Sequence, residues 1–131
     1  MITSLHNRAV REVTALLGKK KERDRQSLFV VEGGKMFGEA PAERISRVYI
    51  AQGAETEMYA RYGDKLSGLS CEIVADEVFA KMSDTVTPQG ILCLVRQQHY
   101  NIEEILRQSN EKHALFIMLE DIQDPGNLGT I

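Results

Sequence analysis

The stretch "SLFVVEGGKMFGEAPAERISRVYIA", residues 27–51, decides the fold. It opens with a β-branched and aromatic run closed by a glycine pair, which is typical of a buried strand. "KMFGEA" then favours a short helix that stops at Pro41, because proline cannot continue a helix. "RVYIA" follows as a second strand. A strand, a helix and another strand in close succession indicate a layered α/β fold.

The same alternation continues toward the C-terminus. "TEMYARYGDKLSG" favours a helix, "CEIVA" a strand, "DEVFAKMSD" a helix and "GILCLVR" a strand. Helical segments that alternate with strands cover both faces of a sheet. We therefore predict a three-layer α/β/α sandwich built around about four strands.

Toward the N-terminus, "SLHNRAVREVTALLG" has the apolar spacing of one helical face. The residues on this face are Leu5, Ala9, Val13, Leu16 and Leu17. Ser4 or Thr3 can cap the start of this helix and Gly18 its end. The charged segment "KKKERDRQ", residues 19–26, is predicted to be a solvated connector.

The chain is acidic as a whole, with a net charge of −3, but its basic charge is local. Residues 1–25 carry seven lysines and arginines and three acidic residues, a net charge of +4, whereas the remaining residues carry a net charge of −7. A local positive surface is what contacts with RNA phosphates require. A charged, solvated helix face is the alternative interpretation of the same residues.

Two polar loops are candidate binding elements. "SDTVTPQG", residues 83–90, offers hydroxyls and the Gln89 amide to a base or a ribose, although the same residues also suit an ordinary turn. In "DPGNLG", residues 124–129, Pro125 and Gly126 suit a type II turn. Asn127 in that turn would offer its amide to a ligand if the turn follows a strand of an α/β sheet.

Composition excludes several other classes. Cys71 and Cys93 lie in apolar runs and are expected to be buried and unpaired, and the three histidines are far apart, so no metal site is expected. No run is long enough to span a membrane, and the N-terminus lacks the apolar core of a signal peptide. We therefore expect a cytoplasmic protein that has no membrane partner.

The polar segment 97–113, with a short amphipathic helix, is the best candidate for a domain boundary, and "ALFIMLE", residues 114–120, is predicted to begin a new strand. Three further segments, taken together, resemble the SpoU (TrmH) family of RNA ribose 2′-O-methyltransferases. They are "ITSLHNRAVREVTALLGKKKERDRQSLFVVEG" (2–33), "MSDTVTPQGILCLV" (82–95) and "LEDIQDPGNLGTI" (119–131).

The resemblance implies a substrate-binding domain over residues 1–100, similar to RNA-binding ribosomal proteins, and a linker over 101–112. Residues 113–131 would be the first strand and loop of a truncated, trefoil-knotted catalytic domain. In the full-length parent that domain binds S-adenosylmethionine and forms a homodimer. In this family the residue matched by Asn127 works with an arginine a few positions on, which this sequence does not reach. The chain alone is therefore expected to bind no cofactor and to be inactive.

The resemblance makes RNA the expected partner, ribosomal RNA more than transfer RNA. Asn127 is the predicted catalytic residue. The residues predicted to bind RNA are Asn7, Arg8, Arg11, Lys19, Lys20, Lys21, Arg23, Thr87 and Gln89. Two alternatives stay open, namely a complete non-catalytic RNA-binding or assembly protein and an interaction domain that uses its acidic surface.

Overall fold

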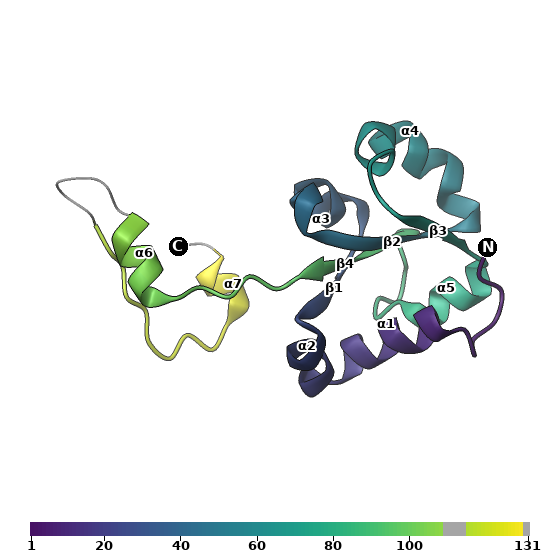
Figure 1. The fold of residues 1–131 in the computed structure, drawn as a ribbon. Helices are drawn as coiled ribbons and strands as arrows, with labels where there is room; N and C mark the ends of the chain where they lie inside the picture. Colours follow the sequence, from purple (N-terminus) through teal and green to yellow (C-terminus); the bar gives the residue numbers. More distant parts are fainter. Residues whose placement is uncertain (109–114, 130–131) are drawn as a thin grey trace. The chain divides into compact units, whose positions relative to one another are not determined.

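The computed structural model describes residues 1–108 and 115–129, and the chain divides into two units, Met1–Gln98 and His99–Ile131. The first unit is built on a four-stranded sheet of order β1-β4-β2-β3 (Figure 1). The strands are β1 (Leu28–Glu32), β2 (Ile45–Ala51), β3 (Cys71–Val74) and β4 (Ile91–Arg96). β4 pairs antiparallel with β1 and β2, and β2 pairs parallel with β3.

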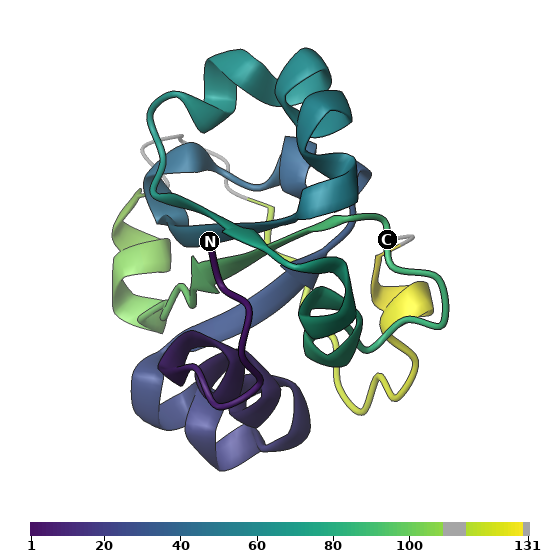
Figure 2. The same cartoon turned by 90° about the vertical axis from the view of Figure 1, so that its right-hand side faces the viewer.

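Helices cover both faces of this sheet (Figures 1 and 2). α3 (Gly34–Glu39) and α4 (Glu55–Leu66) lie on one face. α1 (Arg8–Gly18), α2 (Lys20–Gln26) and α5 (Asp76–Met82) lie on the other. Two 3₁₀ turns, Ala42–Arg44 and Gln52–Ala54, precede and follow β2. The predicted three-layer α/β/α sandwich with four strands is thereby confirmed.

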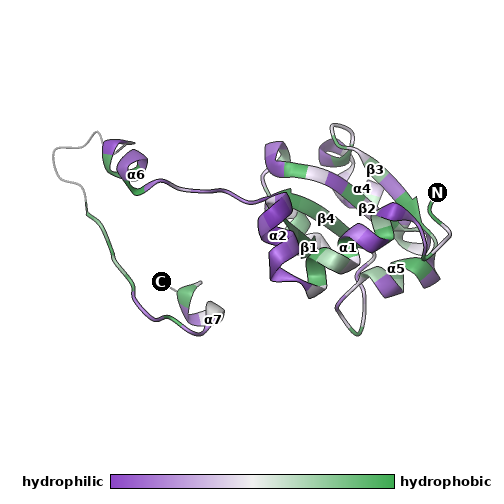
Figure 3. Cartoon of the chain, turned by 60° about the horizontal axis from the view of Figure 1, so that its bottom comes forward, coloured by the Kyte–Doolittle hydropathy of each residue, from purple (hydrophilic) through white to green (hydrophobic). Residues whose placement is uncertain are grey.

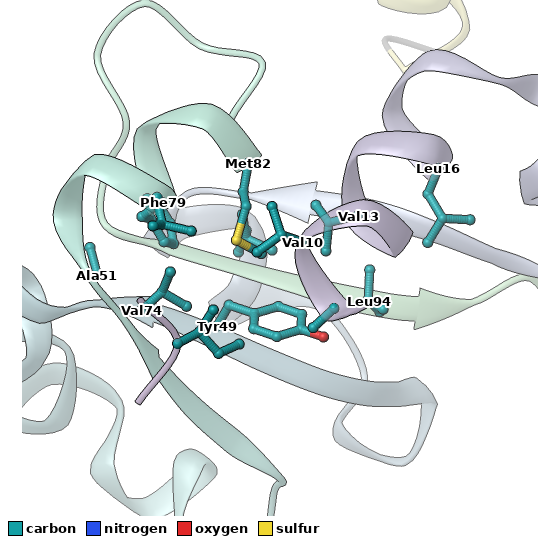
Figure 4. Close-up of a cluster of buried hydrophobic side chains, with 13 residues drawn as sticks. Val10, Val13, Leu16, Tyr49, Ala51, Val74, Phe79, Met82 and Leu94 are labelled. Carbon is teal, nitrogen blue, oxygen red and sulfur yellow. The ribbon is translucent and has the colours of Figure 1, made fainter. Parts of the chain in front are cut away.

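The central strand β4 joins the two halves of the core. Its side chains alternate, so that Leu92 and Leu94 join the cluster under α1 and α5, whereas Ile91, Cys93 and Val95 join the cluster under α3 and α4. Figure 4 shows the first cluster, in which α1 contributes Val10, Val13 and Leu16. A strand covered on both faces has a continuous apolar sequence, which explains why "ILCLV" alone predicts a buried strand.

Tyr49 is fully buried in this first cluster, and its hydroxyl has no hydrogen-bond partner of acceptable geometry among the described residues (Figure 4). Burial raises the pKa of Tyr49, and the neighbouring Arg47 guanidinium opposes this rise only in part. A buried hydroxyl without a partner costs about 1–3 kcal/mol of folding free energy.

We therefore expect Tyr49→Phe to leave the free energy of unfolding unchanged or to raise it by up to about 1 kcal/mol in urea unfolding. The ring still fills the same space, so no cavity is created. A loss of more than about 1 kcal/mol would contradict this expectation, because it would show that the hydroxyl is bonded to Arg47.

Cys71 and Cys93 are both free. Cys93 is buried, as predicted, and burial raises its pKa to about 12. The prediction of burial is wrong for Cys71, which is only half-buried at the edge strand β3. No cluster of potential metal ligands occurs among residues 1–108 and 115–129. In the same residues, no helix combines the length and the apolar character that crossing a membrane requires.

Two predictions about the N-terminal segment are wrong. α1 begins after Asn7, whose Oδ1 accepts a hydrogen bond from the Ala9 N–H at 2.8 Å, so neither Ser4 nor Thr3 caps it. The predicted apolar face of the helix is also wrong in one member. Leu5 precedes the helix and is 49% exposed, whereas Val10, which the predicted face does not include, is buried in the core.

The charged segment 19–26 is not a connector, because residues 20–26 form α2. Arg23 explains this helix, since its Nη1 donates to the carbonyl oxygens of Leu16 and Leu17 at 2.7 and 3.1 Å and so docks α2 on the end of α1. Ser27, with a φ of 51°, ends α2 in the left-handed conformation.

The second unit contains α6 (Ile102–Gln108), as the amphipathic pattern predicted, and a helical turn, α7 (Pro125–Leu128). The predicted strand over 114–120 and the type II turn at 125–126 are wrong for the described residues. Residues 115–124 form neither strand nor helix, and their apolar side chains are exposed, with Met118 at 91%. An apolar run becomes a strand only when a neighbouring strand pairs with it.

Candidate nucleic-acid interface

α1 and α2 carry a row of exposed cations, and Figure 3 shows α2 as strongly hydrophilic. The predicted RNA-binding residues Arg8, Arg11, Lys19, Lys20 and Lys21 are all exposed. We call these five residues the basic surface. Within the described residues, no hydrogen bond or ion pair engages the side chains of Arg8, Arg11, Lys20 and Lys21. Their charges are therefore available to an external anion.

Two other arginines of this segment are occupied within the fold. Arg23 caps the carbonyl end of α1, as described above. Arg25 pairs with Glu22 at 2.7 Å, and this bond lowers the pKa of Glu22 and raises that of Arg25. Sequence reasoning missed the role of Arg23, because its acceptors are backbone carbonyls that no sequence pattern reveals.

Asn7 also has a structural task. Its side-chain oxygen caps α1, and it lines a cavity of about 300 Å³ together with Arg8, Glu12, Arg47 and Glu72. The lining of this cavity therefore carries charges of both signs. The structure keeps Asn7 next to Arg8 at the start of α1, as the sequence order requires.

Glu32 positions the polar loop at residues 83–87. Its carboxylate accepts hydrogen bonds from Ser83 Oγ, from the Asp84 N–H at 3.2 Å and from Thr85 Oγ1 at 2.6 Å. Three hydrogen bonds to one carboxylate hold the loop against the end of β1. Sequence reasoning did not single out Glu32, and the only signal available was its place between a strand and a glycine pair.

The other end of this loop is fastened by Gln89. Its Oε1 accepts a hydrogen bond from the Gly34 N–H, at the start of α3, at 3.2 Å. Between the two attachments, Thr87 is exposed and Val86 is fully exposed. Thr87 and Gln89 therefore stand on a loop that both ends hold in place.

The Lys19–Lys21 end of the basic surface and the 83–90 loop lie near opposite ends of β1. α2 and Ser27 directly precede Leu28, whereas Glu32 holds the loop at the other end of the strand. A five-residue strand spans about 13–17 Å. One RNA must therefore extend beyond the length of β1 to contact Lys20 and Thr87 together.

Asn127 belongs to the second unit. It lies in α7 and is exposed, and Asp124 caps this turn by accepting a hydrogen bond from the Gly126 N–H at 2.8 Å. An acidic residue followed by a helical turn replaces the predicted type II turn, because a carboxylate satisfies the first free N–H groups of a helix.

A cavity of about 490 Å³ lies beside the 83–90 loop. It is lined by Gly34, Ala51, Gly53, Ala54, Glu57, Met58, Arg61, Asp76, Pro88, Gln89 and Gly90. Four chain segments that are far apart in sequence meet here, so only the folded structure reveals this cavity. Of the predicted site residues, it contains Gln89 alone.

Comparisons with known proteins agree with this architecture. Residues 7–93 match the family model of the MRM3-like substrate-binding domain. The chain is 31% identical to an uncharacterised tRNA/rRNA methyltransferase of Synechocystis sp., over 99% of this chain and 46% of that protein. It is 28% identical to the 23S rRNA (guanosine(2553)-2′-O)-methyltransferase RlmP of Bacillus subtilis, over 99% of this chain and 48% of that protein.

Among solved structures, that of an RNA 2′-O ribose methyltransferase superposes with a TM-score of 0.65 at 26% identity, covering 98% of this chain and 48% of that one. The chain thus spans about half the length of these relatives. The family match extends from the cap of α1 into β4 and so includes both faces of the sandwich. The chain therefore belongs to the SpoU (TrmH) family of RNA methyltransferases, and residues 7–93 are its MRM3-like substrate-binding domain.

Proposed function

We propose that this chain is the RNA-binding part of a cytoplasmic enzyme that transfers a methyl group from S-adenosylmethionine to a ribose 2′-hydroxyl of ribosomal RNA. The match of residues 7–93 to a substrate-binding domain carries the proposal. The Bacillus subtilis relative is a 2′-O-methyltransferase of a 23S rRNA guanosine, which supports both the reaction and the class of RNA.

The proposal assigns a domain to each stretch of the chain. Residues 1–100 bind the substrate, residues 101–112 link, and residues 113–131 begin the catalytic domain, through which the full-length parent forms a homodimer. The division of the chain into Met1–Gln98 and His99–Ile131 supports the first of these boundaries. Asn127 would contribute to the catalytic site of the complete enzyme.

The basic surface supplies the phosphate contacts in this proposal, with a further contribution from Asn7. Arg23 would have to share its guanidinium between a phosphate and the carbonyls of α1. Thr87 and Gln89 would lie nearer the target nucleotide. The exposed cations that have no side-chain partner among the described residues support this assignment, since phosphate contacts supply most of the affinity in sequence-independent nucleic-acid binding.

The described residues of the second unit do not fit S-adenosylmethionine. Every side chain described between residues 115 and 129 is exposed, whereas a cofactor of this size needs a concave site that buries most of its surface. The 131 residues alone are proposed to bind RNA without methylating it.

Two titrations of one preparation test this proposal. Calorimetric titration of the chain with fragments of ribosomal RNA is expected to give saturable binding. Added transfer RNA should displace these fragments only weakly. Titration with S-adenosylmethionine is expected to give no heat of binding. Failure to bind either RNA, or micromolar binding of S-adenosylmethionine, would overturn the proposal.

A further inference from the structure

The cavity of about 490 Å³ at the end of β2 has no task in the phosphate contacts described above. It lies where the start of α3, the turn before α4, the start of α5 and residues 88–90 converge. Its volume lies in the range of small-ligand sites, about 300–1,000 Å³, and can hold one nucleoside. Its size and position make it a candidate site for part of the RNA.

Apolar groups form the inner wall of this cavity. Met58 is 3% exposed and Ala51 is 7% exposed, and both line the cavity together with Pro88 at its rim. Flat aromatic bases are recognised by apolar surfaces that cover their faces and a few polar groups that contact their edges. The inner wall therefore suits the face of a base.

Two polar side chains offer free hydrogen-bonding atoms to the cavity. Gln89 Oε1 is used by Gly34, and its Nε2 has no partner among the described residues. Asp76 Oδ1 accepts from the Gly53 N–H at 2.9 Å, and its Oδ2 likewise has no partner among these residues. Each side chain is held through one atom, so its other atom is fixed as a donor or an acceptor for a ligand.

The charge of the residues that line the cavity favours a base over a phosphate as the ligand. Glu57 and Asp76 contribute two carboxylates, whereas Arg61 contributes one guanidinium, which lies 3.5 Å from the Glu57 carboxylate. Two negative charges against one positive charge repel a phosphate. A neutral base whose edge carries an N–H donor and an oxygen or nitrogen acceptor matches Asp76 and Gln89.

We propose that this cavity takes one unpaired base of the bound RNA, with an N–H of the base donating to Asp76 Oδ2 and Gln89 Nε2 donating to an acceptor on the same base. This inference rests on the proposed function, because it presumes that the chain binds RNA. It places the target-reading part of the domain at the opposite end of β1 from the Lys19–Lys21 end of the basic surface.

The test compares five labelled RNA hairpins that differ only at one bulged position. Four hairpins carry adenine, guanine, cytosine or uracil there, and the fifth carries an abasic residue. Fluorescence anisotropy of the 131-residue chain is expected to show about tenfold tighter binding of at least one base-bearing hairpin. Equal affinity for all five RNAs would overturn the inference and leave the proposed function standing.

Asp76→Asn supplies the discriminating variant. Asparagine keeps an oxygen for the Gly53 N–H but replaces the free acceptor with a donor, and it removes a negative charge. The net-charge effect alone should strengthen RNA binding, whereas the inference predicts that the preference for the base-bearing hairpin falls severalfold.

Asp64→Asn, which removes the same charge on α4 outside the cavity, is the matched control and should keep the preference unchanged. Urea unfolding verifies that each variant folds. An unchanged preference in Asp76→Asn would overturn the inference. Absence of binding to every hairpin would overturn the proposed function and the inference together.

Discussion

Replacing Gly90 by alanine is expected to lower the free energy of unfolding of the chain by about 3 kcal/mol or more. Gly90 is buried and has a φ of 76°, a conformation that L side chains rarely adopt. A Cβ added there would lie 2.3 Å from the Cβ of Ala54, far inside van der Waals contact. Strain in the backbone and overpacking against Ala54 therefore act together.

Urea unfolding followed by circular dichroism measures this loss, and Gly63→Ala provides the matched control. Gly63 lies in α4, where an added Cβ would meet no atom within 4 Å, so the same substitution should raise the free energy of unfolding by about 0.5–1 kcal/mol. A Gly90→Ala variant within about 0.5 kcal/mol of the unmodified chain would contradict the close approach of residues 54 and 90.

Gly90 and Ala54 also line the cavity proposed to take a base. The Gly90 carbonyl oxygen accepts a hydrogen bond from the Ala51 N–H at 2.9 Å, and the missing side chain of Gly90 leaves room for the Ala54 methyl group, so this part of the cavity wall is held in place. A variant that moves residues 88–90 should therefore lose the preference for a base-bearing hairpin before it loses binding through the basic surface.

Neutralising Lys19, Lys20 and Lys21 with glutamine is expected to weaken RNA binding about 100-fold at 0.1 M salt. Each phosphate contact contributes roughly 0.7–0.9 to the magnitude of the slope of log affinity against log salt concentration. At 0.1 M salt each contact therefore raises the affinity by about 0.7–0.9 log units relative to 1 M salt. All three lysines are exposed and none lies in the core, so the free energy of unfolding should change little. Fluorescence anisotropy with a labelled hairpin measures the affinity.

The control removes two cations from elsewhere. Lys81→Gln with Arg107→Gln removes exposed charges from α5 and α6. This variant should bind RNA within about threefold of the unmodified chain, because it lowers only the net charge. Equal losses in both variants would show that net charge, and not the basic surface, determines the affinity.

The sandwich could be predicted from the sequence because its signals are local. "ILCLV" is apolar at every position because β4 is buried on both faces. This short run therefore predicts a strand that is covered by other elements on both sides. The helix over 20–26 could not be predicted, because it depends on Arg23 reaching carbonyl oxygens seven and six residues earlier. A run of charged residues by itself predicts a solvated segment, because the sequence does not show that Arg23 bonds to the carbonyl oxygens of α1.

The C-terminal segment shows the opposite failure. Residues 115–119 have the composition of a buried strand, yet the structure gives them no strand, because pairing partners decide whether an apolar run becomes a strand. Asn127 therefore stays a prediction that depends on family resemblance. The geometry described for α7 neither assigns nor removes a catalytic role.

The candidate site was only partly visible in the sequence. The basic surface could be located because lysine and arginine carry their charge whatever the fold. Thr87 and Gln89 could be located because a polar loop is recognisable in the sequence. Glu32, Asp76 and the cavity could not, because residues 34, 54, 76 and 89 come together only through the order of the strands. Their roles depend on hydrogen bonds across more than 20 positions of sequence.

The dependence of RNA affinity on salt concentration tests most directly whether the basic surface binds RNA phosphates. For the unmodified chain and for the variant with glutamine at 19, 20 and 21, the slope of log affinity against log salt should differ by about 2–3, close to three phosphate contacts. Identical slopes would contradict this role and would leave the lysines as a solvated face of the fold.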